Sequence, residues 1–574
     1  MTRWVLAVLA ALLVTALLVT GCATVPESSD VRVLRSVPAG PQIAPPAGPS
    51  PGANPFRLVR DFIEATGSPA NGHAAARAFL TEEAAETWDD DASLTVVEDF
   101  PDTTPRAASP PDPDTSSVVV RAVEIGTLAA GGSFIADAEL STMMLDLVRE
   151  DGEWRITNPR PGVIVESTAF QQNYRNVNAW FLDPAGGTLV PDVRWVPGQP
   201  DDTLAGRALD ALLGGPSVAL ADAVVSAFPL QTHPRSNALV RADGRTVIDL
   251  AGMAAVGEQE RRLAAAQLVS TLAGLVRPPF ELLADGEPLV PGKPDWRPAD
   301  ITAFMAASGP RPDVEGLVVS GGRLRSLFGV PLPGAAGSGG LQVLTAARSS
   351  PEGRRLATVA ARQGGGPQLL VGDTGDGLTP VALDAASMTR PTWRPSGSEV
   401  WTVINGSTVA GVALSDSGPP ATYQVNAAEL AELGPITELR LSRDGVRVAA
   451  VVGGQLVVAT VVSRSGEVSI RRPRVLHPGP ITSAVSVDWA RSDLLMVASA
   501  DPGPQVAEVS VDGVVYRAVS TTNLTAPLTG LVAAPGREVI VSDVNGLWTY
   551  SQGQEVWEPL LGGIGPGAVP LYPG

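Results

Sequence analysis

Cysteine and histidine are scarce in this chain of 574 residues, which contains one cysteine, Cys22, and three histidines. A single thiol excludes a disulfide within the chain, a CxxC redox pair and a metal site built from several thiolates. His73, His233 and His477 lie in different parts of the sequence, and none has a second histidine at a zinc-ligand spacing. The sequence therefore predicts no metal and no cofactor, and a stability that comes from packing.

Positive charge is also scarce, because 41 lysines and arginines are outnumbered by 60 aspartates and glutamates, for a net charge of −19. This acidity would repel a phosphate backbone, so nucleic acid is not expected as a partner. A literal G-x-S-x-G occurs at Gly48 to Gly52, but prolines on both sides of Ser50 prevent the strand-to-helix elbow of a hydrolase nucleophile. The run Asp89-Asp90-Asp91 is typical of a solvated acidic loop. No catalytic residue is predicted.

One long hydrophobic run is present, from Trp4 to Thr20, and Arg3 is the only positive charge before it. This pattern indicates an export signal, and an uncleaved membrane-spanning helix or a buried helix are the alternatives. Val19-Thr20-Gly21-Cys22 resembles a bacterial lipobox, with valine in place of the commoner leucine. The resemblance implies cleavage between Gly21 and Cys22, and a Cys22 that carries S-diacylglycerol and an N-palmitoyl group. The two acyl chains of the diacylglycerol alone supply on the order of 20 kcal/mol of membrane affinity. A reactive thiol or an intermolecular disulfide is the alternative use of this cysteine.

Residues 1–21 are thus predicted to be a lipoprotein signal peptide, and residues 22–55 a lipidated cysteine with a proline-rich tether. Residues 56–170 read as an α+β domain that starts with two helices, in "NPFRLVRDFIEATGS" and "GHAAARAFLTEEAAETW". Strands follow, with a hairpin turn at Asp151-Gly152, and "DFPDTTPRAASPPDPDTSS" before them has the composition of a disordered segment.

Residues 171–305 read as a second α+β domain. One helix is closed by Gly214-Gly215-Pro216, a hairpin turns at Asp243-Gly244, and "EQERRLAAAQLVSTLAGLV" is a further amphipathic helix. The order of elements and the phrases "LLGGP", "DGRTVIDL" and "AAAQLVSTLAGL" resemble the GerMN domain of envelope and sporulation proteins. That resemblance implies an envelope role and no known chemistry.

Residues 306–574 contain a repeated phrase of strand, tight turn and strand, whose turns fall at Pro351, Pro395, Arg443, Arg491 and Pro535. A second hairpin follows each phrase, so each repeat supplies four strands, as in a propeller blade. The sequence predicts an all-β propeller of five or six blades, in which "GLVVSGGRLRSLFGVP" could add to a closing blade, and a two-sheet sandwich is the alternative. Trp393-Arg394 and Asp488-Trp489 recur at one phase, which favours packing between blades over a recognition face. Asp373 and Asp376 lie in a glycine-rich turn and are not expected to bind a metal.

The complete order of parts is a lipobox, a tether, a domain with "GEWRITNPRPGVIV", a GerMN-like domain with "LVPDVRWVP" and a propeller that ends in "VPLYPG". In this order the chain resembles the actinobacterial lipoprotein LpqB family over essentially its whole length. The resemblance implies a lipid-anchored protein on the extracytoplasmic face of the cell membrane. It also implies a non-enzymatic accessory of the MtrB sensor histidine kinase, bound to the kinase's extracytoplasmic domain, that acts through the MtrA regulator on cell-wall homeostasis and division. An envelope enzyme, or a protein that binds wall glycan in the propeller channel, is the alternative function.

Overall fold

A computed structural model describes residues 48–574, except 107–111, 185–186, 237–244, 307–308, 416–417, 465, 478, 502, 552, 554 and 561–563. Cys22, the hydrophobic run and most of the proline-rich tether lie outside the described residues. The described residues form one compact unit. Within the described part, no helix combines the length and the apolar character that crossing a bilayer requires.

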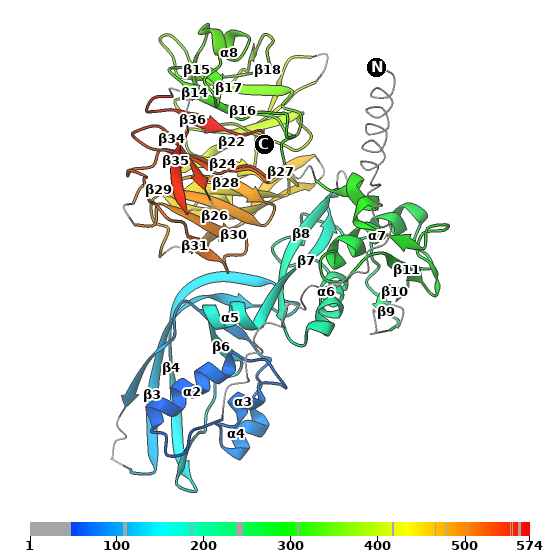
Figure 1. Ribbon diagram of the computed structural model, residues 1–574, viewed down its shortest axis with the longest axis vertical. Helices are drawn as coiled ribbons and strands as arrows, with labels where there is room; N and C mark the ends of the chain where they lie inside the picture. The colour runs from blue at the N-terminus through cyan, green and yellow to red at the C-terminus, as the bar shows by residue number, and fades with distance from the viewer. Residues whose placement is uncertain are drawn as a thin grey trace, which may run out of the picture. The chain divides into compact units, whose positions relative to one another are not determined.

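The first domain has the predicted α+β class and contains a six-stranded sheet with helices (Figure 1). Its strands follow the order β5-β4-β3-β1-β6, and β2 pairs with β3 beside β1. The strands are β1 (Leu94–Val97), β2 (Asp102–Arg106), β3 (Thr115–Leu128), β4 (Phe134–Glu150), β5 (Glu153–Ile156) and β6 (Val163–Glu166). The helices are α2 (Pro55–Thr66), α3 (Ala74–Arg77), α4 (Glu82–Thr87) and α5 (Ser167–Asn173).

Helix α2 confirms the first predicted helix. The Asn54 side chain accepts a 2.8 Å hydrogen bond from the Arg57 amide, and Pro55 occupies the first helical turn, where its missing N–H costs nothing. The prediction of one long second helix was wrong, because the segment forms α3 and α4 with a break between them. At the break, the amide of Thr81 donates to the carbonyl of Ile156 in β5 at 3.0 Å, and the Thr81 side chain caps α4. Pairing with the sheet thus replaces a helical turn.

The longest pairing in this domain joins β3 and β4 (Figure 1). A bulge lies between Glu124 and Gly126 of β3. The alternation of side chains between the two faces of the sheet is interrupted at this bulge. Asp151 and Gly152 form the predicted turn into β5, both with positive φ. The segment "DFPDTTPRAASPPDPDTSS", which has the composition of a disordered region, contributes strand β2 and the first residues of β3, so that expectation was wrong for residues 102–106 and 115–117. Pairing of β2 with β3, and of β3 with β4, orders them.

The second domain is α+β as well. Its strands are β7 (Tyr174–Leu182), β8 (Leu189–Pro197), β9 (His233–Pro234), β10 (Thr246–Ala251), β11 (Phe280–Ala284), β12 (Glu287–Pro288) and β13 (Asp295–Trp296). Its helices are α6 (Leu204–Leu213), α7 (Glu258–Leu272) and two short 3₁₀ turns, η1 (Asp201–Thr203) and η2 (Pro298–Phe304). Helix α6 ends as predicted, and Gly215 takes the left-handed conformation after it. The predicted turn at Asp243-Gly244 lies outside the described residues.

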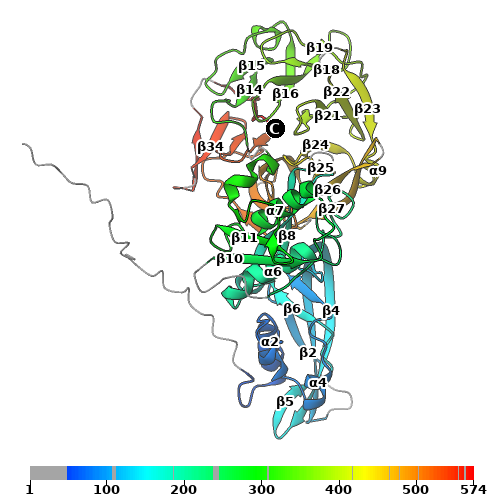
Figure 2. The ribbon, with the colours of Figure 1, turned by 90° about the vertical axis from the view of Figure 1, so that its right-hand side faces the viewer.

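The C-terminal half is a propeller, in which the described residues form five four-stranded sheets and one three-stranded sheet (Figure 2). The four-stranded blades are β16 (Gln342–Arg348) to β19 (Thr379–Pro380), β20 (Thr392–Trp393) to β23 (Ala421–Val425), β24 (Ile436–Leu441) to β27 (Glu467–Leu476), β28 (Ala484–Arg491) to β31 (Tyr516–Ala518), and β32 (Gly530–Val532) to β35 (Val556–Pro559). The strands between these limits are β17 (Arg355–Ala361), β18 (Pro367–Asp373), β21 (Glu399–Ile404), β22 (Thr408–Ala413), β25 (Arg447–Val452), β26 (Gln455–Arg464), β29 (Leu494–Ser499), β30 (Val506–Ser510), β33 (Ile540–Ser542) and β34 (Leu547–Ser551). Two short helices, α8 (Ala335–Ser338) and α9 (Ala428–Ala431), lie in connections.

The sixth blade closes the ring with strands from both ends of the propeller segment. Strands β14 (Leu317–Ser320) and β15 (Arg323–Ser326) precede the repeats, and β36 (Val569–Leu571) follows them. Leu317 pairs with Leu571, and Val319 pairs with Val569. The six-blade alternative of the sequence prediction therefore holds, and "GLVVSGGRLRSLFGVP" supplies two of the closing strands.

Candidate functional site in the propeller channel

Strands β24 and β28, the segment just before β20 and the turn just after β24 bring five charged side chains together. The repeats explain this gathering, because Arg440 and Asp488 are 48 residues apart and so are Arg390 and Glu438. Residues at one phase of a propeller repeat occupy the same position in neighbouring blades. Because alternate residues of a strand share a face, Glu438 and Arg440 point to the same side of β24.

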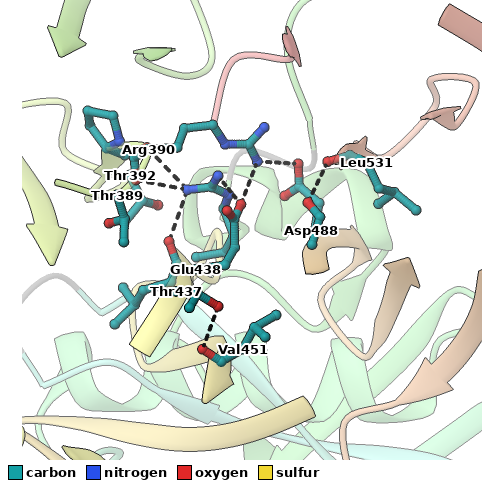
Figure 3. A network of polar contacts seen from close by, with 12 residues as sticks. Thr389, Arg390, Thr392, Thr437, Glu438, Val451, Asp488 and Leu531 are labelled. Atoms are coloured by element: carbon teal, nitrogen blue, oxygen red, sulfur yellow. Dashed lines mark hydrogen bonds and ion pairs between the residues drawn. The ribbon is translucent and has the colours of Figure 1, made fainter. Parts of the chain in front are cut away.

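Arg390 is the centre of the network shown in Figure 3. Its Nη2 lies 3.2 Å from Oδ2 of Asp488 and 3.6 Å from Oε1 of Glu438, and its Nη1 donates to the carbonyl of Pro570 in β36 at 3.3 Å. The side chains are nearly buried, with relative exposures of 10% for Arg390, 14% for Glu438 and 15% for Asp488. One guanidinium thus connects three blades, including the one that closes the ring.

Arg440 completes the network from the other side of Glu438. Its Nη2 is hydrogen-bonded to Oε1 of Glu438, and its Nη1 donates to the carbonyls of Arg390 and Pro391 at 3.2 and 3.3 Å. Arg443, on the turn after β24, donates to the Ser350 hydroxyl at 3.0 Å and to the Pro573 carbonyl at 3.1 Å. Three arginines therefore accompany two carboxylates.

Burial changes the proton affinity of these carboxylates. It raises the pKa of Glu438 to about 7, although Arg390 favours the charged form, and the nearby Asp488 adds to the rise. Burial also raises the pKa of Asp488, against the stabilising charge of Arg390. The network is therefore sensitive to pH near neutrality.

Little space is left among these side chains. The cavity lined by Arg390, Arg440 and Asp488 measures about 20 Å³, which is room for about one water. A larger hollow of about 540 Å³ lies next to it, and its lining includes Arg394, Ser396, Ser398, Glu399 and Arg443 of the propeller and Asp183 and Thr188 of the second domain. The channel network therefore links neighbouring blades. The hollow, in contrast, has room for a small polar molecule.

The recurring tryptophans pack between blades, as predicted. Trp393 and Trp489 are buried, and each donates its indole N–H to a carbonyl of the preceding blade, at Ala347 (3.1 Å) and Arg440 (3.2 Å) respectively. Their charged neighbours differ. Asp488 joins the channel network, whereas Arg394 lies 3.8 Å from Glu399.

The acidic run of the first domain is only partly solvated. Asp89 and Asp91 are exposed, but Asp90 is buried and its carboxylate contacts His73 at 2.8 Å and also Arg77. The side-chain hydrogen bond from His73 and the charge of Arg77 hold the pKa of Asp90 below its usual range, although burial acts against them. No group of three or more possible metal ligands is found in the part of the chain that the structure describes.

Sequence reasoning missed the channel network, although the signal was present. Aligning the repeats on Trp393 and Trp489 places Thr392, Arg440 and Asp488 in one column, and Arg390, Glu438 and Ser486 in another. When residues at the same position of neighbouring repeats carry opposite charges, they indicate an ion-pair network between blades.

Comparison with known proteins accounts for nearly the whole chain. Three family models match it, described as the Lipoprotein LpqB N-terminal domain over residues 48–171, Sporulation and spore germination over residues 178–290, and the Lipoprotein LpqB beta-propeller domain over residues 322–573. Relatives named Lipoprotein LpqB include those of Rhodococcus jostii (strain RHA1), 35% identical over 99% of this chain and 97% of the relative, and Nocardia farcinica (strain IFM 10152), 34% identical over 98% of each. The Mycobacterium tuberculosis (strain CDC 1551 / Oshkosh) protein of that name is 34% identical over 96% of this chain and 97% of its own.

Solved structures are more distant. The match to a putative 6-phosphogluconolactonase from Bacteroides fragilis NCTC 9343 covers 45% of this chain and 97% of that protein, with 10% identity and a TM-score of 0.30. The full-length matches and the two LpqB-specific domains decide the assignment: the chain belongs to the LpqB lipoprotein family.

Proposed function

We propose that the protein is a lipid-anchored lipoprotein on the extracytoplasmic face of the cell membrane, and a non-enzymatic accessory of an MtrB-like sensor histidine kinase. In this role it binds the kinase's extracytoplasmic domain and affects cell-wall homeostasis and division. The observation that carries the proposal is the near full-length match to proteins named lipoprotein, in a chain whose one cysteine, Cys22, follows an uncharged run.

Anchoring explains how a weak contact could regulate the kinase. A lipidated Cys22 would hold the protein at the membrane in which the kinase is embedded, and restriction to one membrane raises the effective concentration of each partner. The channel network supports a binding role over catalysis, because charged side chains occupy the propeller axis and leave about 20 Å³ there.

The variant Cys22→Ala tests the anchor. We expect the protein to leave the membrane fraction, to lack the mass of the lipid groups, and to lose its effect on kinase-dependent phosphorylation of the response regulator. Cys22→Ser with the same readouts is the matched control for side-chain size. A variant that is soluble and still couples fully to the kinase would contradict tethering, and kinase output that is the same with and without the wild-type protein would contradict the accessory role.

The hollow of about 540 Å³ favours wall-glycan binding as a second candidate function, since its serine hydroxyls and charged groups offer hydrogen bonds to a sugar. Calorimetric titration of the full-length protein in detergent with soluble peptidoglycan fragments distinguishes the candidates. Saturable binding that Ser396→Trp abolishes would support a glycan site, and release of smaller fragments would reveal an enzyme.

A further inference from the structure

Strand β4 has an open edge in the middle of its length. It has 17 residues, and β3 pairs with nearly all of them, but β5 covers only Leu147 to Glu150 on the other side. The preceding stretch of β4 lies at the border of the six-stranded sheet (Figure 2). An uncovered edge of this length is a template for another strand.

The backbone direction shows which groups the open edge offers. Asp146 uses its N–H and C=O on the β5 side, because its amide donates to Oδ1 of Asn158 at 2.6 Å and its carbonyl accepts from the Thr157 amide at 2.9 Å. In an antiparallel ladder, every second residue faces the same side. The register with β3 has no shift between Glu139 and Val148, so the N–H and C=O groups of Leu140, Thr142 and Met144 also face the open edge.

Apolar side chains accompany these groups. Leu140 and Met144 have relative exposures of 70% and 44%, and Val123 of β3, directly opposite Leu140, is 46% exposed. The alternate residue Leu145 points into the core. An added strand would therefore gain backbone hydrogen bonds at the edge and apolar contact on this open face.

The open edge is bounded at both ends. Asp146 and Asn158 close one end, as described above, and near the other end Ala136 packs against a hydrophobic cluster formed by the first domain together with propeller residues. The interval fits a strand of about six residues, or roughly 20 Å at 3.3 Å per residue.

The charged residues beside the open edge indicate which side chains an added strand should carry. Glu139 lies directly opposite Glu124 across the ladder, an arrangement that destabilises a strand pair. Arg160 lies 4.0 Å from Glu124, and no cation within 4.0 Å of Glu139 is recorded in the described part of the chain. A lysine or arginine on an added strand, beside Glu139, would offset the repulsion. A second copy of this chain, paired about Thr142, would bring Leu145 rather than a cation to Glu139.

We infer that the edge of β4 from Leu140 to Met144 binds an extended segment of a partner protein, in which apolar residues alternate with polar ones and a lysine or arginine lies beside Glu139. The inference rests on the proposed function, because it assigns this segment to the extracytoplasmic domain of the sensor kinase. It specifies the contact as strand addition to the first domain.

Thr142→Pro and Thr142→Ala form the matched pair that tests it. Proline removes the outward N–H of Thr142 and is tolerated at an edge, whereas alanine keeps the N–H. With full-length protein and the full-length MtrB-like kinase of the same organism in detergent micelles, we expect proline to raise the Kd about tenfold or more and alanine to leave it within about twofold. Hydrogen exchange at Leu140, Thr142 and Met144 in the wild type should slow when the kinase is added.

Glu139→Lys tests the charge argument, with Glu139→Gln as its control. We expect lysine to weaken binding about fivefold, less at high salt, and glutamine to weaken it less. Unchanged affinity of a folded Thr142→Pro variant would overturn the inference and leave the proposed function standing. A wild type that does not bind the kinase would overturn both. A wild-type dimer that Thr142→Pro abolishes would assign the edge to a second copy and overturn the inference.

Discussion

Arg390 is the side chain on which the channel network depends most, because it contacts Asp488, Glu438 and the Pro570 carbonyl together. Replacing it by methionine would leave two nearly buried carboxylates without their shared cation. We expect Arg390→Met to lower the free energy of unfolding of the propeller by about 3 to 5 kcal/mol, measured by denaturant titration followed by tryptophan fluorescence.

Arg471→Met is the control for that measurement. Arg471 also pairs with a carboxylate, Glu429 at 2.7 Å, but its side chain is 49% exposed. An exposed pair contributes about 1 kcal/mol or less. Equal losses for the two variants would contradict a structural role for the channel network.

Glu438 should make propeller stability depend on pH. Its pKa is about 7 in the folded protein and near 4.5 in an unfolded chain, so the folded state holds the proton over this interval and the unfolded state does not. The free energy of unfolding should therefore fall as pH rises from about 4.5 to 7, by up to about 1.4 kcal/mol per pH unit, and the raised pKa of Asp488 acts in the same direction. Denaturant titrations of Glu438→Gln across this range should show a shallower slope, and parallel curves would contradict the assignment.

Residue-level prediction from sequence succeeded where the recurrence of a residue type between repeats was enough. Trp393 and Trp489 could be assigned to packing because their recurrence marks a position inside the blade. The partners of Arg390 could not be predicted in this way, because the contact joins residues 48 and 98 positions away that meet only when neighbouring blades surround an axis.

At the scale of elements, the β3–β4 bulge depends on Gly126. Its φ is +153°, and a Cβ there would overlap the Ile135 carbonyl oxygen and the Phe134 ring. We expect Gly126→Ala to cost about 2 kcal/mol or more of stability, measured by thermal and denaturant unfolding.

Gly152→Ala provides the matched control. Gly152 has a positive φ of +84°, but nothing lies within 4 Å of the position of an added Cβ. Its cost should be limited to the backbone conformation, about 1 kcal/mol. A larger loss at Gly152 than at Gly126 would contradict the steric argument.

The elements themselves followed from sequence pattern where local signals agreed. Asn54 and Pro55 specify the start of α2, and the apolar spacing specifies its buried face. The break between α3 and α4 was not predicted, since Thr81 bonds to Ile156, 75 residues further along the chain. Helical composition around Thr81 is overridden there by tertiary pairing.

At the scale of the whole molecule, closure of the ring depends on β36. Leu571 is buried and pairs with Leu317, so an aspartate there would place a charge without a partner in the core of the closing blade. We expect Leu571→Asp to lower propeller stability by about 3 kcal/mol or more and to make β14 and β15 sensitive to limited proteolysis.

Leu344→Asp is the control, because Leu344 lies on β16 but is 47% exposed. It should change stability by about 0.5 kcal/mol or less. The choice between five and six blades could not be made from sequence, because the closing blade has no single repeat: two of its strands precede the array, and Val569 to Leu571 follow it.

The same closure has a consequence for biogenesis. Leu317 and Leu571 are 254 residues apart in the chain and must be on the same side of the bilayer before they can pair. If the protein is exported as proposed, the first blades emerge long before their ring can be completed. Secretion would then expose an unfinished propeller, with the edge of β14 unpaired, until the last strand has crossed the membrane. Periplasmic or cell-surface chaperones would be able to bind the exposed edge during that interval.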